Sequence, residues 1–248
     1  MTSSPTPDFA RRAGTYDELR PTDANWWEVY EALVREGDLT GRRVLDVGCG
    51  TGRFAVALSE LAKVWGVDES PEMLEVARAR APGVRFKEAS AYALPFKDGW
   101  FERATMWLVV HLLDRRRAYA EIRRVLGRGG RIAVATFDPS YFRVFWFRDY
   151  FPSMEEIDLA RFPTRADFES ELQAAGFGTP RFTRISQQAT VSREVALERI
   201  RGRHIATFDL IGDDEFHAGV EKAERELPER VDYRQEWLLA IAETPSRE

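Results

Sequence analysis

A glycine-rich turn constrains the fold of this chain more than any other feature of its sequence. The apolar run Arg43–Val47 leads directly into the turn, and an amphipathic stretch follows from Arg53. Three glycines, Gly48, Gly50 and Gly52, alternate within it. Such a turn between a buried strand and a helix lets a ligand approach the main chain at the carboxyl edge of an open α/β sheet. The sequence therefore predicts a doubly wound α/β fold with a ligand site at this turn.

The spacing of the glycines separates ligand classes. Dinucleotide binding requires G-x-G-x-x-G, whose third glycine would fall at position 53, where Arg53 stands. A side chain there hinders close packing of the helix on the strand and the approach of a pyrophosphate. The phosphate-binding P-loop is also excluded, because no Gly-Lys-Ser/Thr follows. The pattern favours a ligand without phosphates.

Two acids accompany the turn. Asp46 precedes the first glycine, and Asp68 ends the next apolar run, about 20 residues beyond the loop. A carboxylate at the second position can accept both hydroxyl protons of a ribose. Either aspartate alone could be a helix cap or a turn residue, but the two together, in this order, are hard to explain by structural roles alone. The sequence thus predicts a nucleoside ligand.

Short apolar runs alternate with amphipathic stretches up to residue 137, which is typical of βαβ units around a parallel sheet. The predicted strands are Arg43–Val47, Lys63–Val67, Val84–Glu88, Arg103–Trp107, Arg131–Phe137, Arg181–Gln187 and Arg234–Ala242. The predicted helices are Phe9–Asp38, one starting at Arg53, Ser70–Ala81, Arg115–Leu126, Arg165–Ala175 and helical material over Ser192–Glu226. We expect one domain: a helical cap (1–40), a cofactor-binding core (41–137), and a substrate lid with a helical insertion and the last two strands (138–248).

Composition limits the class of protein. The 248 residues carry a formal charge of −5, which argues against a general nucleic-acid binder. No run approaches the ~20 apolar residues that a membrane span needs, and Met1–Asp8 lacks the order of a signal peptide. Cys49 is the only cysteine, so no internal disulfide can form, and the expected location is cytoplasmic.

Four ordered segments carry a family resemblance. They resemble successive motifs of class I S-adenosylmethionine-dependent methyltransferases, closest to the type 11 group that includes ubiquinone and menaquinone biosynthesis C-methyltransferases; the segments are Val44–Phe54, Val64–Ser70, Ala89–Phe96 and Arg124–Arg131. Ala13–Pro21 is also similar to the family's N-terminal segment that covers the cofactor. The resemblance implies a Rossmann-like, seven-stranded, mostly parallel sheet of order 3-2-1-4-5-7-6, with the seventh strand antiparallel. It also implies S-adenosylmethionine as cofactor and S-adenosylhomocysteine as product.

The resemblance also implies roles for individual residues. Asp46 and the glycine loop would surround the methionine part of the cofactor, Asp68 would hold the ribose diol, and Met73 could pack under the adenine. Ser90 replaces the family's usual acid, so we expect weaker adenine binding without a charge-assisted bond. Glu102 stands where the family has aspartate and is expected to be structural. The complete predicted cofactor site is Tyr16, Asp46, Gly48, Cys49, Gly50, Thr51, Gly52, Asp68, Glu69, Met73, Ser90, Ala91 and Trp107.

Methyl transfer from a sulfonium needs few catalytic groups. Positioning of the reactants can supply ~7–11 kcal/mol, whereas a general base typically adds ~10²–10⁴-fold. His111, just after the fourth strand, is the best base candidate, and Tyr16 could cover the cofactor and touch the substrate. Either side chain could instead simply pack. No His, Cys, Asp or Glu grouping has metal-ligand spacing, so we expect metal-independent chemistry.

The aromatic stretch Tyr141–Phe151 is the candidate substrate wall, although it could instead be core or a homodimer contact. As a pocket lining it would favour an apolar or planar small molecule, and Arg143 and Arg148 could bind a carboxylate at its rim. Asp138 could orient a substrate or cap the following turn.

Three functions compete. The first is methyl transfer to a small molecule, and the second is binding of S-adenosylmethionine without transferase activity. The glycine loop is intact and Asp68 is present, so the sequence offers nothing that favours the second function. The third, a nicotinamide dehydrogenase, is opposed by Arg53.

Overall fold

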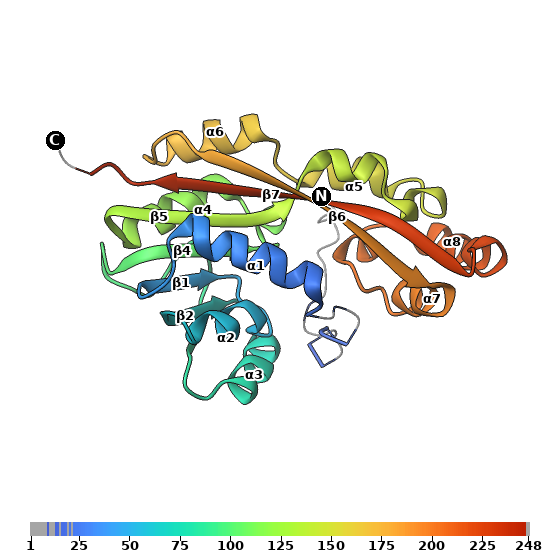
Figure 1. The fold of residues 1–248 in the computed structure, drawn as a ribbon, viewed down its shortest axis with the longest axis horizontal. Coiled ribbons are helices and arrows are strands. Elements are labelled where there is room, and N and C mark those ends of the chain that lie inside the picture. The colour runs from blue at the N-terminus through green and yellow to red at the C-terminus, as the bar shows by residue number, and fades with distance from the viewer. Residues whose placement is uncertain (1–8, 10–12, 15, 19, 21, 247–248) are drawn as a thin grey trace, which may run out of the picture.

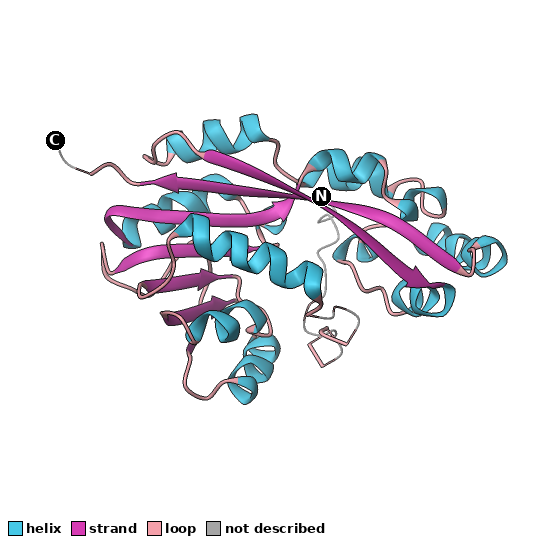
Figure 2. Ribbon diagram, in the orientation of Figure 1, coloured by secondary structure: helices cyan, strands magenta, loops and turns pink. Residues whose placement is uncertain are grey.

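A computed structural model describes residues 9, 13–14, 16–18, 20 and 22–246. The sequence expectation for Met1–Asp8 lies outside the described residues. So does the part of the Ala13–Pro21 resemblance that falls on Thr15, Leu19 and Pro21. Helices cover both faces of a single twisted sheet (Figures 1 and 2). None of the helices in the described part of the chain is long and apolar enough to cross a membrane.

The sheet has seven strands in the order β3-β2-β1-β4-β5-β7-β6, as predicted. Neighbouring strands from β3 to β5 pair in parallel, whereas β7 is antiparallel to both β5 and β6. The strands are β1 (Arg43–Val47), β2 (Lys63–Asp68), β3 (Arg85–Glu88), β4 (Phe101–Trp107), β5 (Leu126–Phe137), β6 (Arg181–Ser192) and β7 (Arg230–Glu243). Right-handed crossovers between the parallel strands account for helices on both faces.

Eight α-helices are found in the described part of the chain: α1 (Ala24–Gly37), α2 (Arg53–Ser59), α3 (Pro71–Arg80), α4 (Arg115–Val125), α5 (Met154–Arg161), α6 (Arg165–Ala174), α7 (Arg193–Arg201) and α8 (Asp213–Glu226). Helices α1 and α2 pack on one face of the sheet, and α4 and α6 on the other. Alternate residues of β5 serve the two layers: Ile132 and Val134 face α4, and Ala133 and Ala135 face α1. The central strands are therefore buried on both faces, which explains their continuous apolar sequence.

The first helix is shorter than predicted. It begins at Ala24 rather than Phe9, because the side chain of Asp23 accepts a hydrogen bond from the Trp26 N–H at 3.0 Å and caps the helix. The described residues before Asp23 lie outside any helix or strand. For the described residues before Asp23 the predicted Phe9–Asp38 helix was wrong, since this aspartate is a start signal that the sequence reading passed over.

The last two strands are longer than predicted. Pairing between β6 and β7 continues past Gln187 to Ser192↔Arg230. We call this antiparallel pair, whose strands are connected through α7 and α8, the β6–β7 hairpin; its outer part projects beyond the other strands (Figure 1). The predicted helical insertion forms α7 and α8 and packs there with α5 and the aromatic stretch around a hydrophobic core of its own. We call this part of the molecule the acceptor lobe (residues 138–161 and 188–234).

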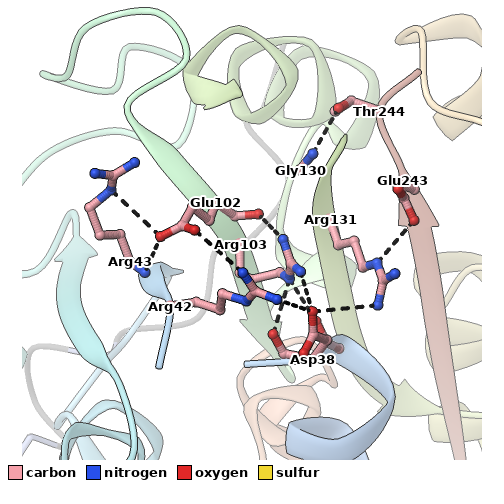
Figure 3. A network of polar contacts seen from close by, with 10 residues as sticks. Asp38, Arg42, Arg43, Glu102, Arg103, Gly130, Arg131, Glu243 and Thr244 are labelled. Carbon is pink, nitrogen blue, oxygen red and sulfur yellow. Dashed lines mark hydrogen bonds and ion pairs between the residues drawn. The ribbon is translucent and has the colours of Figure 1, made fainter. Parts of the chain in front are cut away.

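A polar network fixes the amino edge of the sheet, opposite the glycine loop (Figure 3). The buried Arg103 guanidinium donates from Nε to the Gly37 and Asp38 carbonyls at 3.0 and 3.1 Å and forms an ion pair with the Asp38 carboxylate. Hydrogen bonding to Arg103 lowers the pKa of Asp38. Glu102 accepts from the Arg43 N–H at 3.0 Å, so its predicted structural role is confirmed.

We predict that Arg103→Met lowers the free energy of unfolding by about 2 kcal/mol at pH 7, because the Gly37 and Asp38 carbonyls lose their donor and Asp38 loses one ion pair. The half-exposed Asp38 carboxylate keeps its pair with Arg42 at 2.8 Å, which limits the loss. Urea unfolding measures this change in the free energy of unfolding. The loss should shrink as the pH falls through the lowered pKa of Asp38, because a protonated carboxyl no longer pairs. The exposed Arg128, changed to Met, is the control; equal stability of the two variants would contradict the prediction.

Candidate active site

The glycine loop leaves β1 in a conformation that needs glycine. Gly48, Gly50 and Gly52 have φ of 71°, 52° and 77°, in the left-handed region. A Cβ on Gly48 would lie 2.4 Å from Cγ2 of Val109, so this position also packs too closely for any side chain. Bare main chain is thus presented at the carboxyl edge of the sheet, as the spacing predicted.

Asp68 joins the glycine loop to the next strand. Its Oδ2 accepts from the Gly50 N–H at 2.8 Å, and its Oδ1 accepts from the Ser70 N–H at 3.0 Å. Burial raises the pKa of Asp68, against the effect of these hydrogen bonds. Ser70 caps α3 by accepting from the Met73 N–H at 3.2 Å, which fixes the buried Met73 in the first turn of that helix. Two predicted site residues are therefore held together by local chain geometry.

Asp46 is a buried acid that forms no ion pair within the described part of the chain. Its Oδ1 accepts from the Thr105 hydroxyl at 2.9 Å, and its side chain is almost wholly buried. Burial raises the pKa of Asp46 to about 7, despite the Thr105 hydrogen bond. A carboxyl in this state favours a positively charged ligand group, which would restore the charged form.

The N-terminal segment is tied to the glycine loop through Asp17. The Asp17 carboxylate accepts from the Thr51 hydroxyl at 3.1 Å, lies 3.5 Å from Nη1 of Arg53 and forms an ion pair with Arg80. Sequence reasoning missed these contacts and used Arg53 only to exclude a dinucleotide. An acid in a covering segment together with basic residues on the first turn of α2 and the last turn of α3 was the available signal.

A cavity of about 300 Å³ extends from the glycine loop to the acceptor lobe. The predicted residues that line it are Tyr16, Asp46, Gly48, Cys49, Gly50, Thr51, Trp107 and His111. The other predicted cofactor residues, Gly52, Asp68, Glu69, Met73, Ser90 and Ala91, do not line it. Asp68 and Glu69 stand at the end of β2 and Ser90 and Ala91 follow β3, where the Ala89 N–H donates to the Asp68 carbonyl at 3.0 Å. Gly52 is the N-cap of α2, and Met73 lies on the first turn of α3.

Further lining residues come from the extended β6–β7 hairpin and were missed. The register pairs Gln187 with Gln235 and Ala189 with Tyr233, so these side chains share one face of the hairpin with Trp237. All five line the cavity, as does Arg199 from α7. Alternation of Ala189 and Val191 with polar residues was the signal that the strand continued.

The aromatic stretch serves both as cavity wall and as core. Its first part lines the cavity, through Tyr141, Phe142, Phe145, Trp146 and Phe147. Its last residue, Phe151, is fully buried in the acceptor lobe and lies outside the lining. Asp138 accepts from the Ser140 N–H at 2.9 Å, which confirms its capping role.

The two arginines of the stretch do not line this cavity. Arg143 and Arg148 are exposed, and Arg148 lies 3.2 Å from Glu155 in an ion pair. The expectation that they bind a carboxylate at the rim is therefore not supported by their positions, since a turn in the 3₁₀ conformation directs them outward.

His111 stacks on Phe162 with ring centroids 4.1 Å apart and planes 10° from parallel. Burial, and then the charge of Arg161, hold the pKa of His111 well below its usual range, so the imidazole is neutral at physiological pH. Its buried Nδ1 has no hydrogen-bond partner in the described part of the chain. Burial also raises the pKa of the Cys49 thiol, which makes Cys49 an unreactive loop residue.

The methyltransferase domain family matches residues 44–130 of this chain. The demethylmenaquinone methyltransferase of Thermus thermophilus is 42% identical over 106 residues, which cover 40% of this chain and 48% of that protein. The match thus spans about half the length of that relative. The O-methyltransferase rstn1 of Aspergillus nomiae is 33% identical over 185 residues, covering 65% of this chain and 78% of that protein.

Among solved structures, a methyltransferase from an antibiotic biosynthesis pathway of Anabaena variabilis superimposes with a TM-score of 0.69 at 23% identity, covering 86% of this chain and 96% of that chain. This likeness shows the fold. The chain belongs to the class I S-adenosylmethionine-dependent methyltransferase family, as its sheet order, its glycine loop and its relatives together establish.

We predict that Asp46→Asn stabilises the ligand-free protein. Because the folded pKa of Asp46 is raised to about 7, ionising this side chain costs folding free energy as the pH rises from about 4 to about 7. Removing the charge should raise the free energy of unfolding by about 1–3 kcal/mol at pH 8 and by much less at pH 5. Urea unfolding at both pH values measures this change. A variant no more stable than the wild type at pH 8 would contradict the unfavourable ionisation of Asp46.

Proposed function

We propose that this protein transfers a methyl group from S-adenosylmethionine to a small-molecule acceptor by in-line displacement, without a metal ion. One observation carries the proposal: a single cavity runs from the glycine loop to an aromatic wall, so donor and acceptor sites are continuous. A domain that only bound the cofactor would have no need of the second half of that cavity.

The residues present fit the cofactor. Asp46, which is buried and forms no ion pair among the described residues, suits the positive charge of the methionine part, and the loop Gly48–Thr51 offers bare main chain beside it. Asp68 would accept from the ribose hydroxyls with the lone pairs that Gly50 and Ser70 leave available. Met73 would pack against the adenine, and Ser90 would accept a neutral hydrogen bond from it.

S-adenosylmethionine supplies an electrophilic methyl on a sulfonium, which the acceptor atom takes as the sulfur becomes a neutral thioether. The chain's own task is to align the acceptor and exclude water. Trp107, Phe142 and Trp237 line the cavity with apolar rings, which keep it dry and favour a planar acceptor. Tyr16, under the Arg20 guanidinium at 3.8 Å, covers the glycine-loop end.

We assign His111 the role of proton acceptor where an oxygen or nitrogen acceptor is methylated. Its neutral imidazole lines the cavity, and stacking on Phe162 holds the ring in one plane. The lowered pKa limits its strength as a base, so the expected contribution is at the lower end of the usual range.

The second function, cofactor binding without transfer, is separated from the first by turnover. Calorimetric titration with S-adenosylmethionine, S-adenosylhomocysteine and NAD should give binding of the first two and none of the third. Incubation with labelled donor and a panel of planar acceptors should then give a labelled product. Binding without any product would favour the second function, and NAD binding would overturn both.

We predict that Asp68→Ala weakens S-adenosylhomocysteine binding by about 1.5–3 kcal/mol, the range for losing hydrogen bonds to a charged acceptor. Calorimetry measures the dissociation constant. Asp68→Asn, which keeps the size of the side chain, should lie between wild type and alanine. Glu75→Ala, an exposed change on α3, is the control. An unchanged constant in Asp68→Ala would remove this residue from the site.

We predict that His111→Gln lowers kcat for an oxygen or nitrogen acceptor by about 10²-fold while leaving the S-adenosylhomocysteine dissociation constant unchanged. The pH profile provides an independent readout, because the acidic limb set by His111 should disappear in the variant. His217→Gln, exposed on α8, is the control. A kcat within threefold of wild type would leave His111 with packing alone.

A further inference from the structure

The half of the cavity away from the glycine loop has two unlike walls. One is the aromatic stretch, which contributes Phe142, Phe145 and Phe147. The other is the inner face of the β6–β7 hairpin with α7, which contributes amide, phenol, indole and guanidinium groups from Gln187, Tyr233, Gln235, Trp237 and Arg199. An acceptor in this space meets flat apolar rings on one side and polar groups on the other.

Three polar atoms on the second wall are buried and have no hydrogen-bond partner in the described chain: Nε of Arg199, Oε1 of Gln187 and Nε1 of Trp237. The Gln187 amide is oriented by its Nε2, which donates to the Asn25 carbonyl and to Oε2 of Glu28, both at 2.8 Å. A buried polar group left unpaired costs about 1–3 kcal/mol. The three residues that carry these atoms line one cavity, which favours a polar ligand group at this wall.

Arg199 differs from its neighbours in having no counter-ion among the described residues. On the same helix, Arg201 forms an ion pair with Glu224 at 2.6 Å and Arg193 lies 3.8 Å from Glu229. Arg199 has only the Tyr233 hydroxyl, at 3.3 Å from Nη1. No carboxylate among the described residues lies within ion-pair distance of Arg199, although its side chain is half-buried.

Other charges at this end do not neutralise it. Arg20, also lining the cavity, has its pKa lowered by burial and further by the like charges of Arg53 and Arg199. Two acids also line this part of the cavity. Asp158 is engaged by the Thr207 hydroxyl at 2.7 Å and by Arg161 at 3.5 Å, and Asp23 caps α1 by accepting from the Trp26 N–H at 3.0 Å. Arg199 is therefore a cation on the polar wall with no ion-paired carboxylate in the described part of the chain.

We propose that the acceptor is a planar aromatic acid whose carboxylate pairs with Arg199 and whose ring lies against the aromatic stretch. This proposal rests on the proposed function and names its substrate class. The carboxylate would supply the missing counter-ion, and a guanidinium can bind it through two parallel hydrogen bonds. Because the cavity measures about 300 Å³ and also admits the methionine end of the cofactor, the acceptor has one or two fused rings.

The test uses matched acids and amides. Protein saturated with S-adenosylhomocysteine is titrated with 6-hydroxy-2-naphthoic acid and 6-hydroxy-2-naphthamide, and with 4-hydroxybenzoic acid and 4-hydroxybenzamide. Quenching of tryptophan fluorescence reports binding, since Trp107, Trp146 and Trp237 line the cavity. At least one acid should bind about 10- to 100-fold more tightly than its amide, the range expected for a charge-assisted pair.

Arg199→Met keeps the length of the side chain and removes its charge. It should abolish the preference for the acid and leave amide binding and the S-adenosylhomocysteine dissociation constant within threefold of wild type. Arg199→Lys should retain part of the preference, and it tests the same charge if the methionine variant does not fold. Arg143→Met, an exposed change on the neighbouring stretch, is the control and should alter nothing.

The outcomes separate the two proposals. Loss of acid preference in Arg199→Met with cofactor binding intact supports both. Amides that bind as tightly as acids, no acid binding below 1 mM, or an acid preference that survives in Arg199→Met would each overturn the substrate class while leaving methyl transfer standing. Failure of the wild type to bind S-adenosylhomocysteine would overturn the proposed function itself.

Discussion

The hydrogen bond between the Gly50 N–H and the Asp68 carboxylate organises this molecule. It links the exits of two adjacent parallel strands, and it holds a left-handed glycine turn open beside a buried acid, Asp46. The turn can form only because β1 and β2 pair in register, which in turn requires helices on both faces of the sheet. The candidate cofactor site is thus a consequence of strand order, with Thr105 of β4 and Asp17 of the N-terminal segment tied to it by hydrogen bonds.

The part of the fold that local patterns encode could be predicted from the sequence. The alternation of apolar runs and amphipathic stretches predicted the sheet core, and Ser70-Pro71 marked the start of α3. The order of all seven strands came from the family resemblance and is confirmed. The errors lie where a single side chain or long-range pairing decides: Asp23 sets the start of α1, and polar residues such as Gln188 conceal the outer half of β6.

The candidate site divides in the same way. Residues next to the glycine turn were predictable because the chain itself brings them together. Arg199 was not, since it reaches the cavity only when an insertion folds against a hairpin whose length was underestimated. Arg143 and Arg148, which the sequence offered as carboxylate ligands, point outward because their 3₁₀ turns present the apolar neighbours inward. Proximity along the chain is a poor guide where two non-local elements meet.

The acceptor lobe has a hydrophobic core of its own, separate from the two layers that sandwich the sheet. Residues that shape one half of the cavity can therefore be exchanged without disturbing the strands that present the donor. The methyltransferase domain match, which ends at residue 130, falls entirely outside this lobe. A chain built in this way can diversify its chemistry by rewriting one module while inheriting the other unchanged, so the lobe is where engineered specificity should begin.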